Sequence, residues 1–266
     1  MTQMRQSRPI GVFDSGAGGL TVLEALRRRM PQQDFIYVAD TSRVPYGRKP
    51  KAMVARFACE IAGFLENDGV QGIIVACNTA SAASLPGLQE GLSVPVWGVI
   101  EPGVRAAVRT TKSGWVGVIG TAGAVSSDAY QDRLRALGLR VWAKACPLFV
   151  HLVEERLTNC EEAELLARHY LDERPPIDTL ILGCTHYPHL RRVIRRVVGP
   201  DVQLVDSAAA TADTVFESMG EGTGKGRITY FVTGDTGAFE DTAASLGNLA
   251  GEVVHIPNLA REKVAA

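Results

Sequence analysis

The sequence lacks a long hydrophobic run, an excess of charge of either sign, and paired cysteines. No apolar stretch approaches the roughly 18 residues of a membrane-spanning helix, and the first residues contain no apolar secretory segment. The 28 Lys and Arg residues balance 29 Asp and Glu residues, which argues against a nucleic-acid or membrane-surface partner. The five cysteines form no C-x-x-C pair, which argues against a disulfide framework. These absences predict a cytoplasmic protein.

The composition is that of a folded globular protein. Its 266 residues, at roughly 150 per domain, predict about two domains. The apolar fraction of 46% and the charged fraction of 21% exclude a disordered chain. Short apolar runs alternate with longer amphipathic ones, which is typical of βα units around a mostly parallel sheet. We therefore expect an α/β fold.

Three strand-turn units occur twice in the same order and at nearly constant spacing. The unit at Ile10 resembles the one at Val116, GIIVACNTA resembles TLILGCTHY with Cys77 set on Cys184, and the strand near Val94 resembles the one near Val202. Such a repeat predicts two similar α/β lobes. We expect residues 1–100 and 208–266 to form the first lobe, and residues 101–207 the second.

Ligands of open α/β sheets bind at the carboxyl ends of the strands, which directs attention to the loops there. Four such loops carry chemically useful residues: Asp14-Ser15-Gly16, Cys77-Asn78-Thr79, Thr121-Ala122-Gly123 and Cys184-Thr185-His186. If the lobes face each other, Cys77 and Cys184 approach one cleft from opposite sides. The alternative interpretation is that both cysteines are small hydrophobic residues at strand ends.

Two opposed thiols have a definite chemical use. A helix N-terminus beside a strand end lowers the pKa of a thiol, so we expect each to exchange protons near neutral pH. One thiol then removes the proton from a carbon atom and the other delivers a proton to its opposite face. Among the other cysteines, Cys146 is a weaker candidate for the cleft, and Cys59 is expected to be a packing residue.

Polar residues beside the two thiols are candidate partners. Asp14 is expected to assist proton transfer, hold an ammonium group, or simply cap a turn. His186 is expected to assist Cys184. Tyr46 is expected either to line the cleft or to cap the core. Neutral donors suited to a carboxylate are Ser15, Asn78, Thr79 and Thr185.

Metal and nucleotide sites fit the sequence less well. A dinucleotide site after the first strand has a threonine, Thr21, at the third glycine position, and Asp14 places a negative charge where a pyrophosphate would lie. A zinc site formed by Cys184, His186 and His189 has an unusual ligand spacing. We expect no metal and no cofactor.

The motifs GVFDSGAGGLTV, ADTSRVPYG, VACNTASA, CPLFVHLVEE and LGCTHYP together resemble the glutamate racemase family, from Ile10 to Ser207. The resemblance implies cofactor-independent racemisation of glutamate that supplies D-glutamate for peptidoglycan. It also implies two three-layer lobes related by a pseudo-twofold axis, an active site in the cleft between them, and commonly a homodimer.

The resemblance also implies a role for each matching residue. Cys77 takes the proton from D-glutamate and Cys184 takes it from L-glutamate, while Glu154 supports the second thiol. The residues that fall on substrate-contact motifs are Asp14, Ser15, Tyr46, Gly47, Asn78, Thr79, Thr185 and His186. Two departures are visible, because His151 and Ala124 stand where the family usually has proline and threonine.

Three classes of function remain open from the sequence. The first is a racemase, for glutamate or else for aspartate or another amino acid that bears a carboxylate. The second is a non-catalytic protein that captures a small acidic metabolite in the same cleft. The third is a zinc or dinucleotide enzyme.

Overall fold

The computed structural model describes residues 8–246 and 251–257, which contain two β-sheets. Every pair of neighbouring strands is parallel. The first sheet has the order β10 (Glu252–His255), β9 (Ile228–Val232), β2 (Phe35–Ala39), β1 (Ile10–Asp14), β3 (Ile73–Val75) and β4 (Val96–Gly98). The second has the order β6 (Arg140–Ala145), β5 (Trp115–Gly120), β7 (Thr179–Gly183) and β8 (Gln203–Asp206).

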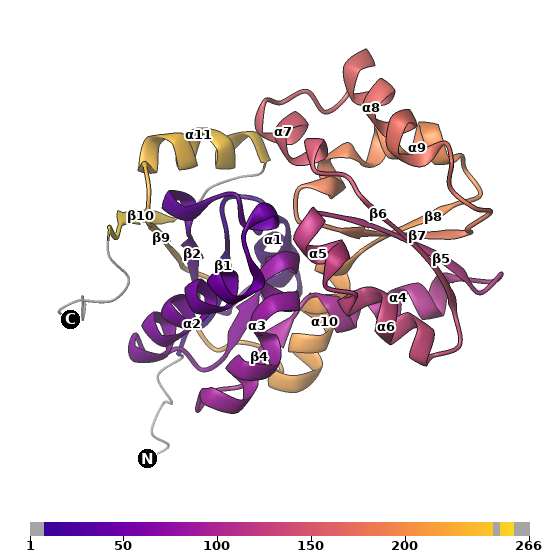
Figure 1. Cartoon of the computed structure of the whole chain (residues 1–266). Helices are drawn as coiled ribbons and strands as arrows, with labels where there is room; N and C mark the ends of the chain where they lie inside the picture. Colours follow the sequence, from indigo (N-terminus) through magenta and orange to yellow (C-terminus); the bar gives the residue numbers. More distant parts are fainter. Residues whose placement is uncertain (1–7, 247–250, 258–266) are drawn as a thin grey trace.

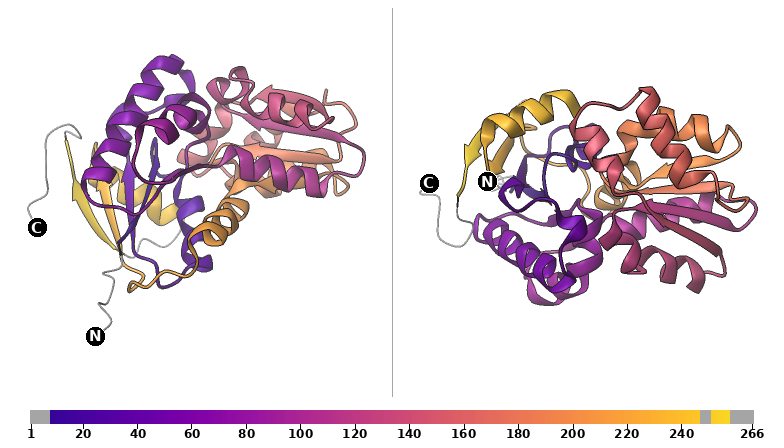
Figure 2. Two further views of the ribbon diagram at one scale, coloured as in Figure 1. Left: turned by 90° about the horizontal axis from the view of Figure 1, so that it is seen from below. Right: turned by 45° about the horizontal axis from the view of Figure 1, so that its top comes forward.

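The two sheets share a topology that matches the sequence repeat. The order β2-β1-β3-β4 in the first sheet corresponds strand for strand to β6-β5-β7-β8 in the second. The repeated units fall on β1 and β5, on β3 and β7, and on β4 and β8. The prediction of two similar α/β lobes is therefore confirmed. Figures 1 and 2 show the lobes side by side, with the yellow β9 and β10 joined to the indigo first lobe.

Helices cover both faces of each sheet. They are α1 (Leu20–Arg29), α2 (Lys51–Asn67), α3 (Asn78–Gly91), α4 (Ile100–Thr110), α5 (Ala122–Ser126), α6 (Ala129–Ala136), α7 (Leu148–Glu154), α8 (Glu161–Leu171), α9 (Arg191–Val198), α10 (Ser207–Met219) and α11 (Thr236–Leu246). Three short 3₁₀ segments are η1 (Thr41–Arg43), η2 (Tyr46–Arg48) and η3 (Tyr187–Leu190). Each sheet thus lies between two helical layers.

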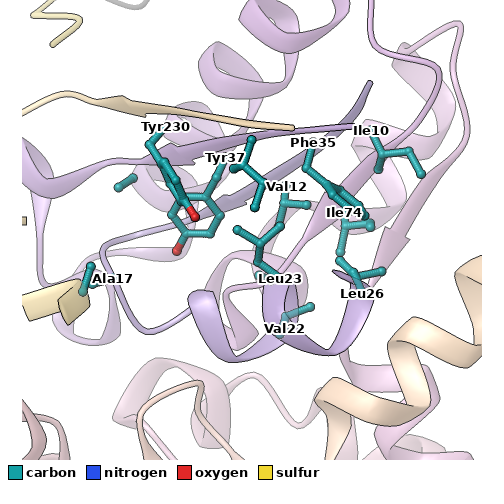
Figure 3. Packing of buried hydrophobic residues seen from close by; sticks show 14 of the residues in the cluster. Ile10, Val12, Ala17, Val22, Leu23, Leu26, Phe35, Tyr37, Ile74 and Tyr230 are labelled. Carbon is teal, nitrogen blue, oxygen red and sulfur yellow. The ribbon is translucent and has the colours of Figure 1, made fainter. Parts of the chain in front are cut away.

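The side-chain alternation of each strand divides its residues between two cores. In β1, Val12 packs against α1 and α10, whereas Phe13 packs against α2 and α3 on the opposite face. Figure 3 shows the first of these cores, where Leu23 and Leu26 of α1 lie against the strand residues Val12 and Ile74. In the second lobe, α7, α8 and α9 cover one face and α4 and α6 cover the other. The loops at the carboxyl ends of both sheets therefore follow strands that are packed on both faces.

Two expectations about particular segments have different outcomes. Cys59 in α2 is exposed, so the prediction that it is a packing residue is wrong, because it lies on the outer face of that helix. The lobe boundaries at residues 100 and 207 stay a prediction, and the outer ends of the predicted first lobe, residues 1–7 and 258–266, lie outside the described residues.

No helix in the described part of the chain is long and apolar enough to cross a membrane.

Candidate active site

Five strands from the two sheets direct their carboxyl ends toward one cavity. Its volume is about 470 Å³, including space open to solvent. The loops after β1, β2 and β3 supply one wall, and the loops after β5 and β7, with α7, supply the other. The lining residues are Ser15, Gly16, Val44, Pro45, Tyr46, Gly47, Cys77, Asn78, Thr79, Thr121, Val150, Glu154, Cys184, Thr185 and His186.

Cys77 is the first of the two thiols on this cavity. It follows β3 and is the N-cap of α3, where the Ala80 N–H donates to Sγ over 3.5 Å. Its thiol also contacts the Ser15 hydroxyl at 3.9 Å. Burial, together with the Asp14 carboxylate and a Cys184 thiolate, raises the pKa of Cys77 to about 12. The prediction of a lowered pKa is therefore wrong for Cys77, because exclusion of water outweighs the helix N-terminus.

Asp14 ends β1 and lies beside Cys77 without lining the cavity. Its side chain is fully buried, and Oδ2 accepts a hydrogen bond from the Gly16 N–H over 3.0 Å. Oδ1 has no hydrogen-bond partner among the described residues. Burial raises the pKa of Asp14, while the charge of His186 and main-chain donors lower it. A carboxyl group with a free buried oxygen is suited to accept a proton or to face a cation.

The second thiol, Cys184, belongs to a row of polar groups that leads to the surface. Its Sγ lies 3.9 Å from Nδ1 of His186, whose Nε2 lies 3.5 Å from Oε1 of Glu154. The other oxygen of Glu154 lies 3.8 Å from Nδ1 of His151. Burial lowers the pKa of His186, but the contacts with Cys184 and Glu154 outweigh it and raise that pKa to about 10. The His186 contact in turn lowers the pKa of Glu154.

The remaining predicted residues are held by contacts between the lobes. The Thr79 and Thr121 hydroxyls lie 2.8 Å apart, and the Thr185 carbonyl accepts from the Thr21 hydroxyl at 3.4 Å. A Cβ on Gly18 would lie 2.5 Å from the Thr185 hydroxyl, so only glycine allows this approach. These contacts bring the strand ends of the two sheets together around the cavity.

Tyr46 both lines the cavity and anchors its loop. The ring is buried, and its hydroxyl donates to the carboxylate of Asp40. The same carboxylate accepts from Arg43 and from the Thr233 hydroxyl. Gly47, the next residue, also lines the cavity. Both interpretations of Tyr46, a cavity wall and a core residue, therefore describe it.

Several functional neighbours were not singled out from the sequence. Val44 and Val150 line the cavity, and the Tyr130 hydroxyl donates to Oδ1 of Asn78 over 2.6 Å. Val44 and Val150 lie within the motifs quoted above, but nothing in those motifs marks their side chains as cavity-lining, and no motif contains Tyr130. Cys146, His189 and Ala124 do not line the cavity. Within residues 8–246 and 251–257, no three His, Cys, Asp or Glu side chains are grouped to hold a metal ion.

Comparisons with known proteins agree with this geometry. The sequence family described as Asp/Glu/Hydantoin racemase matches residues 19–215. A glutamate racemase from Thermus thermophilus is 56% identical over 245 residues, covering 90% of this chain and 92% of that protein. Glutamate racemase structures from Bacillus anthracis and from Francisella tularensis, the latter in complex with D-glutamate, have TM-scores of 0.90 and 0.86 at 38% and 32% identity. The first covers 96% of this chain and 99% of its own, the second 95% and 98%.

Proposed function

This chain belongs to the glutamate racemase family, and on that premise we propose that it interconverts L- and D-glutamate by proton transfer between two thiols, without a cofactor. One observation carries the proposal. Cys77 and Cys184 follow corresponding strands of two similar sheets and line the same cavity. A carbon atom held between them is open to a proton carrier on either face.

The reaction is balanced by the two thiols alone. With L-glutamate, the Cys184 thiolate takes the α-proton and the Cys77 thiol gives its proton to the opposite face. With D-glutamate the roles reverse. The burial that raises the pKa of Cys77 keeps it protonated, which suits it to donate when L-glutamate is the substrate.

Neighbouring groups support the intermediate and the charges around it. Loss of the α-proton places negative charge on the substrate carboxylate, and we propose that Asn78, Thr79 and Thr185, which line the cavity, stabilise it. His186, positioned by Glu154, is a cation beside Cys184. Asp14 lies behind Cys77, where its carboxyl group influences that thiol and the substrate ammonium group.

The substrate is the part of the proposal that a relative supports most directly. The Francisella tularensis enzyme is a glutamate racemase in complex with D-glutamate, and the similarity covers 95% of the length of this chain. We propose that the product D-glutamate supplies peptidoglycan synthesis. The choice of glutamate as the substrate is tested by comparing initial rates with L-glutamate and L-aspartate. A higher kcat/KM for aspartate would contradict it.

The test of the reaction is racemisation of L-glutamate in deuterated water with no added cofactor. We expect the optical rotation to decay to zero and the D-glutamate formed to carry deuterium at Cα. D-glutamate that keeps the original hydrogen would remove the two-thiol mechanism. Calorimetric binding of glutamate without any change in rotation would instead indicate a binding protein.

Assembly and location belong to the same proposal. We expect a homodimer and a cytoplasmic enzyme, as in the family that the motifs resemble. Sedimentation of the purified chain at several concentrations measures the assembly state. A single species with the 28.5 kDa mass of one chain would contradict the homodimer.

A further inference from the structure

Tyr130 joins the two lobes at the level of the thiols. It lies on α6 in the second lobe, and its side chain is 1% exposed. Its hydroxyl donates to Oδ1 of Asn78 over 2.6 Å. Asn78 follows Cys77 directly and lines the cavity from the first lobe. A buried hydroxyl of one lobe therefore holds the side chain next to the thiol of the other.

The ring of Tyr130 also packs beside the second thiol. Gly183 is the last residue of β7 and directly precedes Cys184. A Cβ on Gly183 would lie 3.3 Å from Cε2 of the ring, and a Cβ on Gly103 of α4 would lie 3.4 Å from Cε1. Both contacts are tight, so the two glycines leave the space that the ring occupies. Tyr130 thus contacts Asn78, which follows Cys77, and packs against Gly183, which precedes Cys184.

The hydrogen bond fixes what Asn78 presents to the cavity. A side-chain amide has one acceptor oxygen and two N–H donors. With Oδ1 engaged by Tyr130, the donors of Asn78 are the groups left to face the cavity. Burial raises the pKa of Tyr130, so the phenol stays a donor across the working pH range. The pair therefore offers donors, and not an acceptor, to an anionic group.

We propose that Tyr130 is a positioning residue that aims the amide donors of Asn78 at the substrate carboxylate and keeps the loops of Cys77 and Cys184 in register across the cleft. The proposal rests on the racemase function proposed above. Donors that are already oriented stabilise the charge that develops on the carboxylate without reorganising during the reaction. Both enantiomers present that carboxylate, so Tyr130 serves both directions alike.

The test uses Tyr130→Phe, which removes the hydroxyl and keeps the ring in the space beside Gly103 and Gly183. A hydrogen bond of this kind contributes roughly 0.5–1.5 kcal/mol, so we expect kcat/KM to fall about two- to thirteenfold. The loss should appear in both kcat and KM for both enantiomers, because the donors meet the carboxylate in the bound substrate and also the charge that develops on it in the transition state. The matched control is Tyr170→Phe in the same lobe, because that hydroxyl accepts a hydrogen bond from the Leu148 N–H over 3.5 Å and Tyr170 does not line the cavity. It should keep the wild-type kcat/KM.

A double-mutant cycle separates positioning from general packing. In an Asn78→Ala background, Tyr130→Phe should cost nothing further, because there is no amide left to aim. The same loss in both backgrounds would overturn the proposal, and so would an unchanged kcat/KM in the single variant. Thermal unfolding of each variant confirms that the fold is retained.

A calorimetric cycle keeps the result independent of the proposed function. The same four proteins are titrated with racemic glutamate, and Tyr130→Phe should weaken binding only where Asn78 is present. If the wild-type protein does not racemise glutamate, the function fails while this binding cycle still decides the role of Tyr130. If the wild-type protein racemises glutamate and the cycle is additive, only the role of Tyr130 fails.

Discussion

The two thiols have equivalent positions but unlike surroundings. Cys77 and Cys184 follow matching strands of the two sheets, and each is 6% exposed. Cys77 has the buried carboxyl of Asp14 and the first turn of α3 beside it. Cys184 has the imidazole of His186, which Glu154 contacts from the surface side. One thiol thus has a carboxylate beside it and the other a cation.

This contrast separates what the repeated strand order supplies from what the residues next to each thiol supply. The repeated strand order places the two sulfur atoms on one cavity, which the reaction requires of both. The neighbours then set which form of each thiol is favoured. The free energies of the enantiomers are equal in water, so kcat/KM must be the same in both directions whatever these neighbours are. A difference between the two directions is therefore visible only in kcat and KM taken separately, or in the exchange of the α-proton by one thiol alone.

Removing either thiol should have the largest effect on racemisation. Cys77→Ala and Cys184→Ala each eliminate the proton carrier on one face, so we expect racemisation to fall by at least about 10³-fold. The remaining thiol can still remove and return a proton on its own face. In deuterated water, Cys77→Ala should label only L-glutamate at Cα, and Cys184→Ala only D-glutamate, as followed by proton NMR.

Exposed Cys59 provides the control for these variants, since Cys59→Ala should leave both racemisation and labelling unchanged. Labelling of the opposite enantiomer in either variant would reverse the assignment of the two thiols. Full racemisation by either variant would contradict the mechanism as a whole.

Neutralising the neighbour of each thiol should have the next largest effect. His186→Gln removes the cation beside Cys184, and we expect kcat/KM to fall roughly 10²-fold, equally in both directions. Asp14→Asn removes a charge that raises the pKa of Cys77, so that thiol should react with iodoacetamide at lower pH than in the wild type. Mass spectrometry of the peptide that contains Cys77 measures the change. An unshifted reaction profile would show that burial alone sets this pKa.

The same two groups predict how stability depends on pH. The pKa of His186 rises from 6.5 to about 10 in the folded protein, so its contribution is complete below pH 6.5 and is lost as pH rises through about 10. Cys77 acts in the same direction between pH 9 and about 12, because the fold favours its thiol. We expect Tm to fall between pH 7 and 10, by roughly 2–4 °C per kcal/mol lost. His186→Gln should flatten this fall, and an unchanged slope would contradict it.

The smallest effect is expected at His151, which is half-exposed and touches only Glu154 in this row of groups. The charge of His151 helps to lower the pKa of Glu154, after the larger effect of His186. In His151→Gln, Glu154 should therefore protonate at higher pH, and activity should decline sooner as pH falls. We expect less than about a threefold change in kcat/KM at pH 5–6 and none at pH 8, because exposed charges are screened.

Exposed His169 on α8 is the matched control, since His169→Gln should leave the profile unchanged. A His151→Gln profile that overlies that of the wild type at low salt would remove His151 from the row.

The parts of the molecule that follow from local sequence pattern were predictable. Continuous apolar runs mark buried parallel strands, and the strand ends place Cys77, Cys184 and the loop donors at one edge. The fold class and the family follow from these features and are confirmed. The roles of the site residues stay predictions that the variants above test.

The parts that depend on packing between the lobes were not predictable. Tyr130 sits in α6 with no distinguishing neighbours, and only the tertiary structure brings its hydroxyl to Asn78. The raised pKa of Cys77 likewise depends on how completely water is excluded. A motif reports the helix N-terminus beside the thiol, but it does not report the depth of burial, which decides the sign of the shift.

The pairing of β9 with β2 has a consequence for how the protein is made. Phe35 of β2 pairs with Ile228 of β9, so the middle of the first sheet unites segments from opposite ends of the chain. During synthesis, β2 emerges from the ribosome long before its partner and waits with one edge unpaired while the whole second lobe is translated. The four strands of the second lobe, β5 to β8, follow one another along the chain between Trp115 and Asp206, with no strand of the first sheet between them. The second lobe is therefore free to fold first. Nascent chains halted before Ile228 should therefore bind chaperones through the first lobe.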